Sequence, residues 1–222
     1  MIPSDMTFQR RIIAFAHSTE NPQAFCDALL PQSWVVEAGC EPPSCHDPAL
    51  LLGREADPAS GMALSVSSTA ALSRGLGPDL TDRLADLGAP LGPLAGLALH
   101  ELIVNAALHG NLRVSSGAAS TWPDIADRQA AIEAALANPA YARLCVSVAL
   151  GWGGGAVRAV IADEGAGYDA EAVICPRRAA GRGLRIARMA GRVTVARGGR
   201  QTTLVMDRQP AAGRPGAGGM VP

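Results

Sequence analysis

Short apolar runs bounded by turn residues predict a series of β-strands along the whole chain. We expect strands over Arg10–Ala16, Trp34–Ala38, Met62–Ser67, Arg143–Leu150, Ala156–Ala162, Arg192–Ala196 and Thr202–Met206. The fourth and fifth of these strands flank the glycine-rich turn Gly151–Gly155, which predicts a β-hairpin.

Between the strands, apolar residues that recur at a helical period predict helices. We expect them over Pro22–Leu30, Thr69–Leu87, Pro93–His109, Asp124–Ala137 and Gly183–Met189. Asn21 and Asp124 are the expected N-caps of the first and fourth helices, and Gly191 is expected to stop the last one. This mixture of strands and helices predicts an α/β protein.

The two ends of the chain differ from its middle. Residues 1–61 predict an N-terminal extension, a strand-helix-strand unit of unknown role that includes a turn-rich break at Cys40–Pro48. Residues 209–222 are rich in Gly and Pro and predict a disordered tail. The main domain is therefore expected over residues 62–208.

Composition narrows the class of protein. The chain has 222 residues, of which 48% are hydrophobic and 18% charged, and its formal net charge is −1. These values exclude collagen-like and wholly disordered chains, and they predict no direct binding to nucleic acid. The start of the chain lacks the apolar core of a signal peptide, and no run of about 18 apolar residues could span a bilayer. We therefore expect a cytoplasmic protein without a membrane partner.

The five cysteines are scattered along the chain. Cys40 and Cys45 lie close together and next to His46, as in some metal sites, but no second ligand pair with zinc-like spacing follows. The better interpretation is a set of reduced thiols, as is usual in the cytoplasm.

All 19 basic residues are Arg, which excludes chemistry that needs a Lys nucleophile or a P-loop Lys. Coding bias explains the absence of Lys, but the positions of the Arg residues are informative. No acidic residue lies between Glu171 and Asp207, a stretch that contains many of them: Arg177, Arg178, Arg182, Arg185, Arg188, Arg192, Arg197 and Arg200. Because the planar guanidinium fork suits phosphate oxygens, we expect this stretch to bind phosphate, solvent, an acidic partner or the acidic N-terminal segment.

The helix expected over Pro93–His109 is apolar apart from one stripe. Glu101, Asn105 and His109 follow one another at intervals of four residues and therefore share a face. The stripe either faces water or lines a polar pocket, and its narrowness favours the pocket, since a buried carboxylate needs partners. Glu and Asn oxygens one turn apart suit a hydrated Mg²⁺ ion.

Two glycine-rich segments follow later in the chain. Asp163 ends an apolar strand and is followed by Gly165 and Gly167, where backbone could approach a flat ring without Cβ clashes. Gly181, Arg182 and Gly183 open a helix, whose free N–H groups favour phosphate. An ordinary turn and an ordinary helix start explain each segment equally well when it is taken alone.

Together the three motifs are specific. The series Glu101, Asn105, His109, Gly110, then Asp163, Gly165, Gly167, then Gly181, Gly183, Leu184 resembles the N box and glycine boxes of the GHKL ATPase superfamily. Within it the chain is most similar to the anti-sigma factor serine/threonine kinases, over roughly residues 62–207. This resemblance implies a Bergerat-type two-layer sandwich, with a mixed sheet covered on one face by helices, and the cofactors ATP and Mg²⁺.

The resemblance also implies roles for matching residues. Glu101 would be the general base, and Asn105 would ligate Mg²⁺. Asp163 would bind the adenine amine, with Gly165 and Gly167 beside the base. The other implied nucleotide-binding residues are His109, Gly110, Gly181, Arg182, Gly183, Leu184 and Thr202, and Arg182 is the expected phosphate contact.

The family further implies partners: an antagonist protein of the STAS type, a sigma factor, and a second copy of the chain in a homodimer. Residues 112–141 form an insertion relative to the family, and Gly199–Thr202 departs slightly from its last glycine motif. Two alternatives remain. One is a histidine kinase-like protein, because His17–Pro22 fits a phosphoacceptor pattern, although no dimerisation hairpin surrounds it. The other is a non-catalytic module whose binding to a partner depends on nucleotide.

Overall fold

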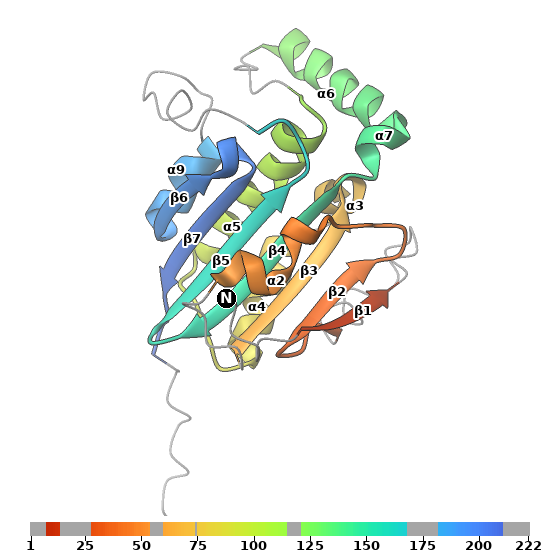
Figure 1. The fold of residues 1–222 in the computed structure, drawn as a ribbon. Helices are drawn as coiled ribbons and strands as arrows, with labels where there is room; N and C mark the ends of the chain where they lie inside the picture. Colours follow the sequence, from red (N-terminus) through yellow and green to blue (C-terminus); the bar gives the residue numbers. More distant parts are fainter. Residues whose placement is uncertain are drawn as a thin grey trace, which may run out of the picture.

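The structure of the protein is a computed structural model that describes residues 8–13, 28–53, 60–73, 75–114, 121–167 and 182–210. Within these residues the chain forms an α/β fold around a seven-stranded mixed sheet with the strand order β1-β2-β3-β4-β5-β7-β6 (Figure 1). The strands are β1 (Gln9–Ile13), β2 (Ser33–Glu37), β3 (Gly61–Ser67), β4 (Cys145–Gly153), β5 (Ala156–Asp163), β6 (Arg192–Ala196) and β7 (Gln201–Asp207). The expected strands are confirmed within the described residues, with ends that differ by no more than three residues.

The central hairpin β4–β5 shows why the sheet forms where it does. Gly154 and Gly155 both have positive φ values, +58° and +84°, which glycine adopts without strain and which a tight two-residue hairpin turn requires. Strand β3 pairs antiparallel with β4, whereas β1, β2 and β3 pair parallel to one another. The sheet is therefore parallel on the side of the N-terminal segment and antiparallel on the other.

One face of the sheet is covered by helices (Figure 1). These are α3 (Ser68–Ser73), α4 (Leu76–Asp86), α5 (Ala95–Asn105) and α9 (Arg182–Ala190), which share the main apolar core with the sheet. The helix expected over Thr69–Leu87 is two helices, α3 and α4. The reason is Gly75, which precedes α4 with φ −78° and ψ 51°, outside the helical range.

The opposite face is not bare, which corrects the expectation of helices on one face only. Helix α2 (Pro48–Leu52) lies across it, and Leu51 and Leu52 pack on Ala63, Ala149 and Val160. The prediction failed because the segment Cys40–Pro48 has the composition of a turn. Its Asp47 instead caps α2, accepting a hydrogen bond of 2.8 Å from the backbone N–H of Ala49.

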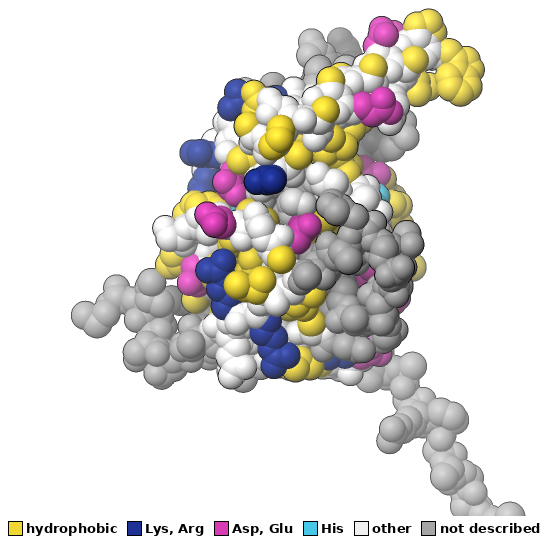
Figure 2. Space-filling model, turned by 90° about the vertical axis from the view of Figure 1, so that its right-hand side faces the viewer, with side chains coloured by type: hydrophobic (Ala, Val, Ile, Leu, Met, Phe, Trp, Pro, Cys, Tyr) yellow, Lys and Arg dark blue, Asp and Glu magenta, His cyan; other side chains and the backbone are white. Residues whose placement is uncertain are grey.

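The insertion forms α6 (Trp122–Ala137) and α7 (Pro139–Ala142), which lie beyond one end of the sheet (Figure 1). Figure 2 shows hydrophobic side chains exposed at the outer end of this projection. Trp122, the first residue of α6, is 82% exposed. Asp124 was predicted as the cap, but the N-cap is Thr121. Asp124 is the reciprocal partner in a capping box, because its carboxylate accepts from the N–H of Thr121.

The N-terminal extension is part of the same sheet through β1 and β2. The helix expected over Pro22–Leu30 and the proposed phosphoacceptor His17 fall almost wholly outside the described residues, as do residues 211–222 of the expected tail. Gln209 is described and donates from its N–H to the carbonyl of Pro90. None of the helices in the described part of the chain is both long and apolar enough to cross a membrane.

The expectation of reduced thiols is wrong for one pair. Cys40 and Cys145, with Cα atoms 6.1 Å apart, form a disulfide that joins the segment after β2 to the start of β4. Sequence spacing could not reveal this pair, because 105 residues separate the two cysteines and they meet only through the pairing of β2 with β3 and of β3 with β4. Cys45 is free and exposed.

Candidate functional site

The candidate site lies at the C-terminal end of β5, on the side of the helices. Val157, Ala159 and Ile161 of β5 face the main core, so Asp163, two residues further, points the same way. The backbone of Gly110 lies directly against its carboxylate, since a Cβ at position 110 would overlap the carboxylate atoms. Asp163 Oδ1 accepts a hydrogen bond of 2.9 Å from the N–H of Gly165. The motifs of Gly110 and Asp163, distant in sequence, therefore meet here.

Glycine is required at three contacts around Asp163. A Cβ at position 165 would overlap the carbonyl group of Gly110, and one at position 167 would overlap the carbonyl of Gly198. Gly167 also has φ +79°, in the left-handed region. Protein backbone therefore fills the space that a Cβ would take at Gly165 and Gly167, and these glycines allow the loop after β5 to pack closely on Gly110 and Gly198.

The environment of Asp163 favours its neutral form. Burial raises the pKa of Asp163 to about 6, while the hydrogen bond from Gly165 and the nearby Arg200 guanidinium act in the opposite direction. Glu164 is half-buried, and burial also raises the pKa of its carboxyl group. A buried carboxylate with a shifted pKa at a strand end is a frequent feature of binding sites.

The polar stripe of α5 meets the start of α9. Glu101 and Asn105 are half-buried. A Cβ at Gly183 would lie 2.7 Å from Glu101 Oε2 and 2.7 Å from Asn105 Nδ2, so α9 approaches these two side chains as closely as it can. The structure thus brings Glu101, Asn105 and Gly183 together, and carboxylate and amide oxygens are of the kind that a hydrated Mg²⁺ ion takes as ligands.

His109 does not continue the stripe by simple helical spacing. After Asn105 the helix widens into a π-helical segment, Ala106–Asn111, and this changes the direction of the side chains that follow. His109 is half-buried, and its Nδ1–H donates to the carbonyl oxygen of Val114 at 2.6 Å. Burial lowers the pKa of His109, and the positive charge of Arg128 acts in the same direction.

Asn111 was missed by the sequence analysis and is the most connected side chain of the site. It is fully buried, and its Nδ2 group donates to Ser68 Oγ at 3.0 Å and to the carbonyls of Leu144 and Cys145, both at 3.2 Å. Its Oδ1 accepts from the N–H of Glu164 at 2.9 Å. The sequence offered one indication of its role, because Asn111 directly follows His109 and Gly110. The helical period of 3.6 residues could not place its side chain in the site, because this period does not hold in a π-helix.

His46 was weighed in the sequence only as a metal ligand and has a different place. It is buried on the far face of the sheet, where Nδ1 lies 3.1 Å from Ser147 Oγ. Burial lowers its pKa to about 4, and a hydrogen bond with the backbone of Asp163 opposes that shift. Close by, Arg197 donates to the carbonyl of Cys45 at 3.2 Å. The N-terminal segment therefore contacts the end of β5 at Asp163 from the face of the sheet opposite the helices.

The remaining predicted residues are placed as follows. Leu184 is buried in the main core, and Thr202 is buried on β7 opposite Ile161, on the same face as Asp163. Helix α9 begins at Arg182, but Gly181 and the side chain of Arg182 lie outside the described residues. Arg200 lies beside Gly167, and Arg197 contacts the N-terminal segment, one of the destinations expected for the arginine stretch.

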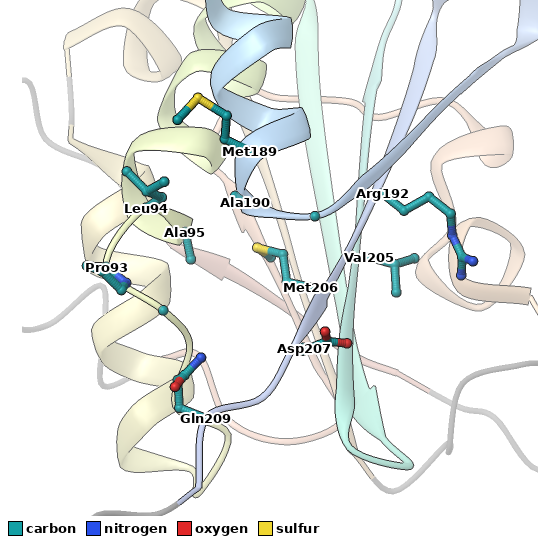
Figure 3. A pocket seen from close by; sticks show the side chains of 12 residues that line it. Pro93, Leu94, Ala95, Met189, Ala190, Arg192, Val205, Met206, Asp207 and Gln209 are labelled. Atoms are coloured by element: carbon teal, nitrogen blue, oxygen red, sulfur yellow. The ribbon is translucent and has the colours of Figure 1, made fainter.

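A cavity of about 460 Å³ opens at the other end of α5 and α9 (Figure 3). Its walls include Leu94 and Met189, which are 38% and 70% exposed, together with Met206. No residue of the predicted site lines it. It is a mainly apolar surface feature, separate from the polar site around Asp163.

Within the described part of the chain, no cluster of three or more His, Cys, Asp or Glu side chains could hold a metal ion. A magnesium ion would therefore rely on Asn105, Glu101 and oxygens of a ligand. The chain matches no description of a known protein family and no curated protein. What the structure itself establishes is an α/β protein with a seven-stranded mixed sheet and a polar site at the end of β5.

Proposed function

We propose that the protein binds Mg-ATP in a Bergerat-type site and transfers the terminal phosphoryl group to a Ser or Thr of an antagonist protein. The observation that carries this proposal is the convergence of three motifs. Gly110 contacts Asp163, Gly165 donates its N–H to Asp163, and Gly183 contacts Glu101 and Asn105. This convergence supports the resemblance of the three segments to the N box and the two glycine boxes.

Asp163 and its glycines fit adenine. The Gly165 N–H occupies Asp163 Oδ1, so Oδ2 is the oxygen free to accept from the exocyclic amine of the base. Gly165 and Gly167 allow the loop after β5 to pack closely on Gly110 and Gly198, and this packing would hold Asp163 in position for the base.

Glu101 and Asn105 fit the reacting end of the nucleotide. The Asn105 amide oxygen suits Mg²⁺, which when bound would neutralise charge on the phosphates. Glu101 would accept the proton of the attacking hydroxyl as its oxygen bonds to the terminal phosphorus and the bond to the ADP oxygen breaks. The free N–H groups at the start of α9 favour phosphate oxygens. Capture of a sigma factor by a homodimer and a cytoplasmic location complete the proposal.

A nucleotide-dependent shift in unfolding temperature tests the binding step. Mg-ATP at about 100 times its dissociation constant stabilises a protein by about 2.7 kcal/mol. In Asp163→Asn, Gly165 keeps Oδ1, and the amide N–H₂ would then face the adenine amine as donor against donor, so we expect the shift to be lost. Wild-type protein without any shift would contradict the proposal.

Incubation with γ-labelled ATP, Mg²⁺ and small STAS-type proteins tests the transfer step. We expect acid-stable label on a Ser or Thr of the partner, lost in Glu101→Ala and kept in Glu133→Ala, which removes an exposed glutamate of α6. Acid-labile label on the protein itself would favour the histidine kinase-like alternative. Binding without transfer would favour the non-catalytic module.

A further inference from the structure

The insertion helix α6 has one face turned toward the body of the protein. Most of its residues are exposed, whereas Arg128, Ile132, Ala135 and Leu136 are half-buried. These positions follow the spacing i, i+4, i+7, i+8 and so lie on one side of the helix. Ile132, Ala135 and Leu136 pack against a cluster formed by Leu108, Leu112 and Val114.

That cluster belongs to the π-helical segment and the residues after it, which also carry His109. Arg128 is half-buried and lies one turn before Ile132, so its side chain starts from the face of α6 that packs on this segment. Its charge is close enough to lower the pKa of His109. Within the described residues, Arg128 makes no ion pair with a carboxylate.

His109 itself is poorly suited to provide positive charge. Its Nδ1–H is engaged with the carbonyl of Val114, and its burial favours the neutral ring, whose Nε2 then carries a lone pair. Glu101, two turns earlier, is an acid. A triphosphate at this end of the site would therefore gain from a cation supplied by another element, in addition to Mg²⁺.

We propose that Arg128, carried by the insertion, contacts the phosphates of a nucleotide bound between α5, α9 and β5, so that the insertion completes the pocket. The inference rests on the proposed function and adds a specificity residue to it. A guanidinium fork can bind two phosphate oxygens at once, which a neutral histidine cannot do. The ligand class it selects is a nucleoside triphosphate rather than a nucleoside or monophosphate.

Calorimetric titration of the full chain with Mg-ATP and with AMP tests this contact. A charge-assisted hydrogen bond contributes enough that Arg128→Ala should weaken Mg-ATP binding about tenfold or more. AMP binding should change much less, and Arg128→Lys should restore part of the ATP affinity. A merely structural effect of the mutation would weaken both ligands alike.

The matched control is Arg143→Ala, which removes the same charge from an exposed position after α7. Equal loss of ATP affinity in the two alanine variants, or equal weakening of ATP and AMP in Arg128→Ala, would overturn the role of Arg128 and leave the proposed function intact. Wild-type protein that binds no adenine nucleotide would overturn both. Unfolding temperatures without nucleotide confirm that each variant is folded.

Discussion

At the scale of single residues, two titratable groups lie back to back across β5. Asp163 faces the helices, and His46, bonded to the Asp163 backbone, lies on the far face. Burial disfavours the charged form of each group, which means a raised pKa for the acid and a lowered pKa for the base. Their effects on the free energy of unfolding are therefore opposite in sign over nearly the same pH range.

The signs follow from proton binding. For Asp163 the pKa rises from 3.8 to about 6, so its contribution is fully present below pH 3.8 and is lost as the pH rises to about 6. For His46 the pKa falls from 6.5 to about 4, so its contribution is present above pH 6.5 and is lost as the pH falls to about 4. Each shift corresponds to about 3 kcal/mol.

We therefore predict that the effects of Asp163 and His46 on the free energy of unfolding largely cancel in the wild-type protein. A variant that lacks one of the two groups should show the effect of the other. Relative to wild type, Asp163→Asn should gain stability as the pH rises from 4 to 6, and His46→Gln should lose stability over the same range. Urea unfolding at several pH values measures both differences. Parallel curves for wild type and both variants would contradict the assignment.

At the scale of elements, sequence periodicity located most of the structure. The strands and the hairpin were predictable because alternation and glycine turns are local signals. The π-helical segment was not, because its hydrogen bonds at Ala106–Asn111 reflect tertiary packing around Asn111. The small helix α2 could not be predicted either, because its five residues are too few to show a helical period.

The site was predictable in part for the same reasons. Glu101 and Asn105 lie in regular helix, and Asp163 ends a regular strand, so the sequence predicted the elements that carry them. His46 and Asn111 hold the Asp163 loop through contacts between segments far apart in the chain. Such contacts leave no periodic trace in a sequence.

The disulfide joins one such distant segment to the site. The backbone N–H of Cys145 donates to Glu164 Oε1 at 2.8 Å, and its carbonyl accepts from Asn111 Nδ2. The disulfide therefore connects Cys40 to a residue that is hydrogen-bonded to both Glu164 and Asn111. Closing a loop of 105 residues restricts the unfolded chain. We predict that dithiothreitol lowers the free energy of unfolding of the wild-type protein by about 2–5 kcal/mol. It should not change the free energy of unfolding of Cys40→Ser, which lacks the disulfide. Equal stability with and without reductant would contradict the disulfide.

At the scale of the whole molecule, the N-terminal segment is an integral part of the fold. It supplies β1 and β2 to the sheet and α2 to the second face, where Leu51 and Leu52 cover Ala149 and Val160. Its boundary at residue 61 marks the start of β3 and lies inside the sheet rather than in an exposed linker.

We predict that a chain lacking residues 1–61 is insoluble or associates. The deletion exposes the edge of β3 together with the apolar surface beneath α2, and exposed strand edges promote aggregation. Light scattering after expression of the shortened chain measures this. A soluble monomer with an unchanged unfolding temperature would show that residues 62–208 form an independent domain.

The contact between Gly110, Asp163 and Gly165 also has a consequence for how this chain can vary. No side chain fits at position 110 or 165 while the other backbone and the carboxylate stay in place. Substitutions at these three positions must therefore be selected jointly, whatever happens elsewhere in the sequence. Distant relatives that share the site should preserve this trio and its spacing even where overall identity has been lost.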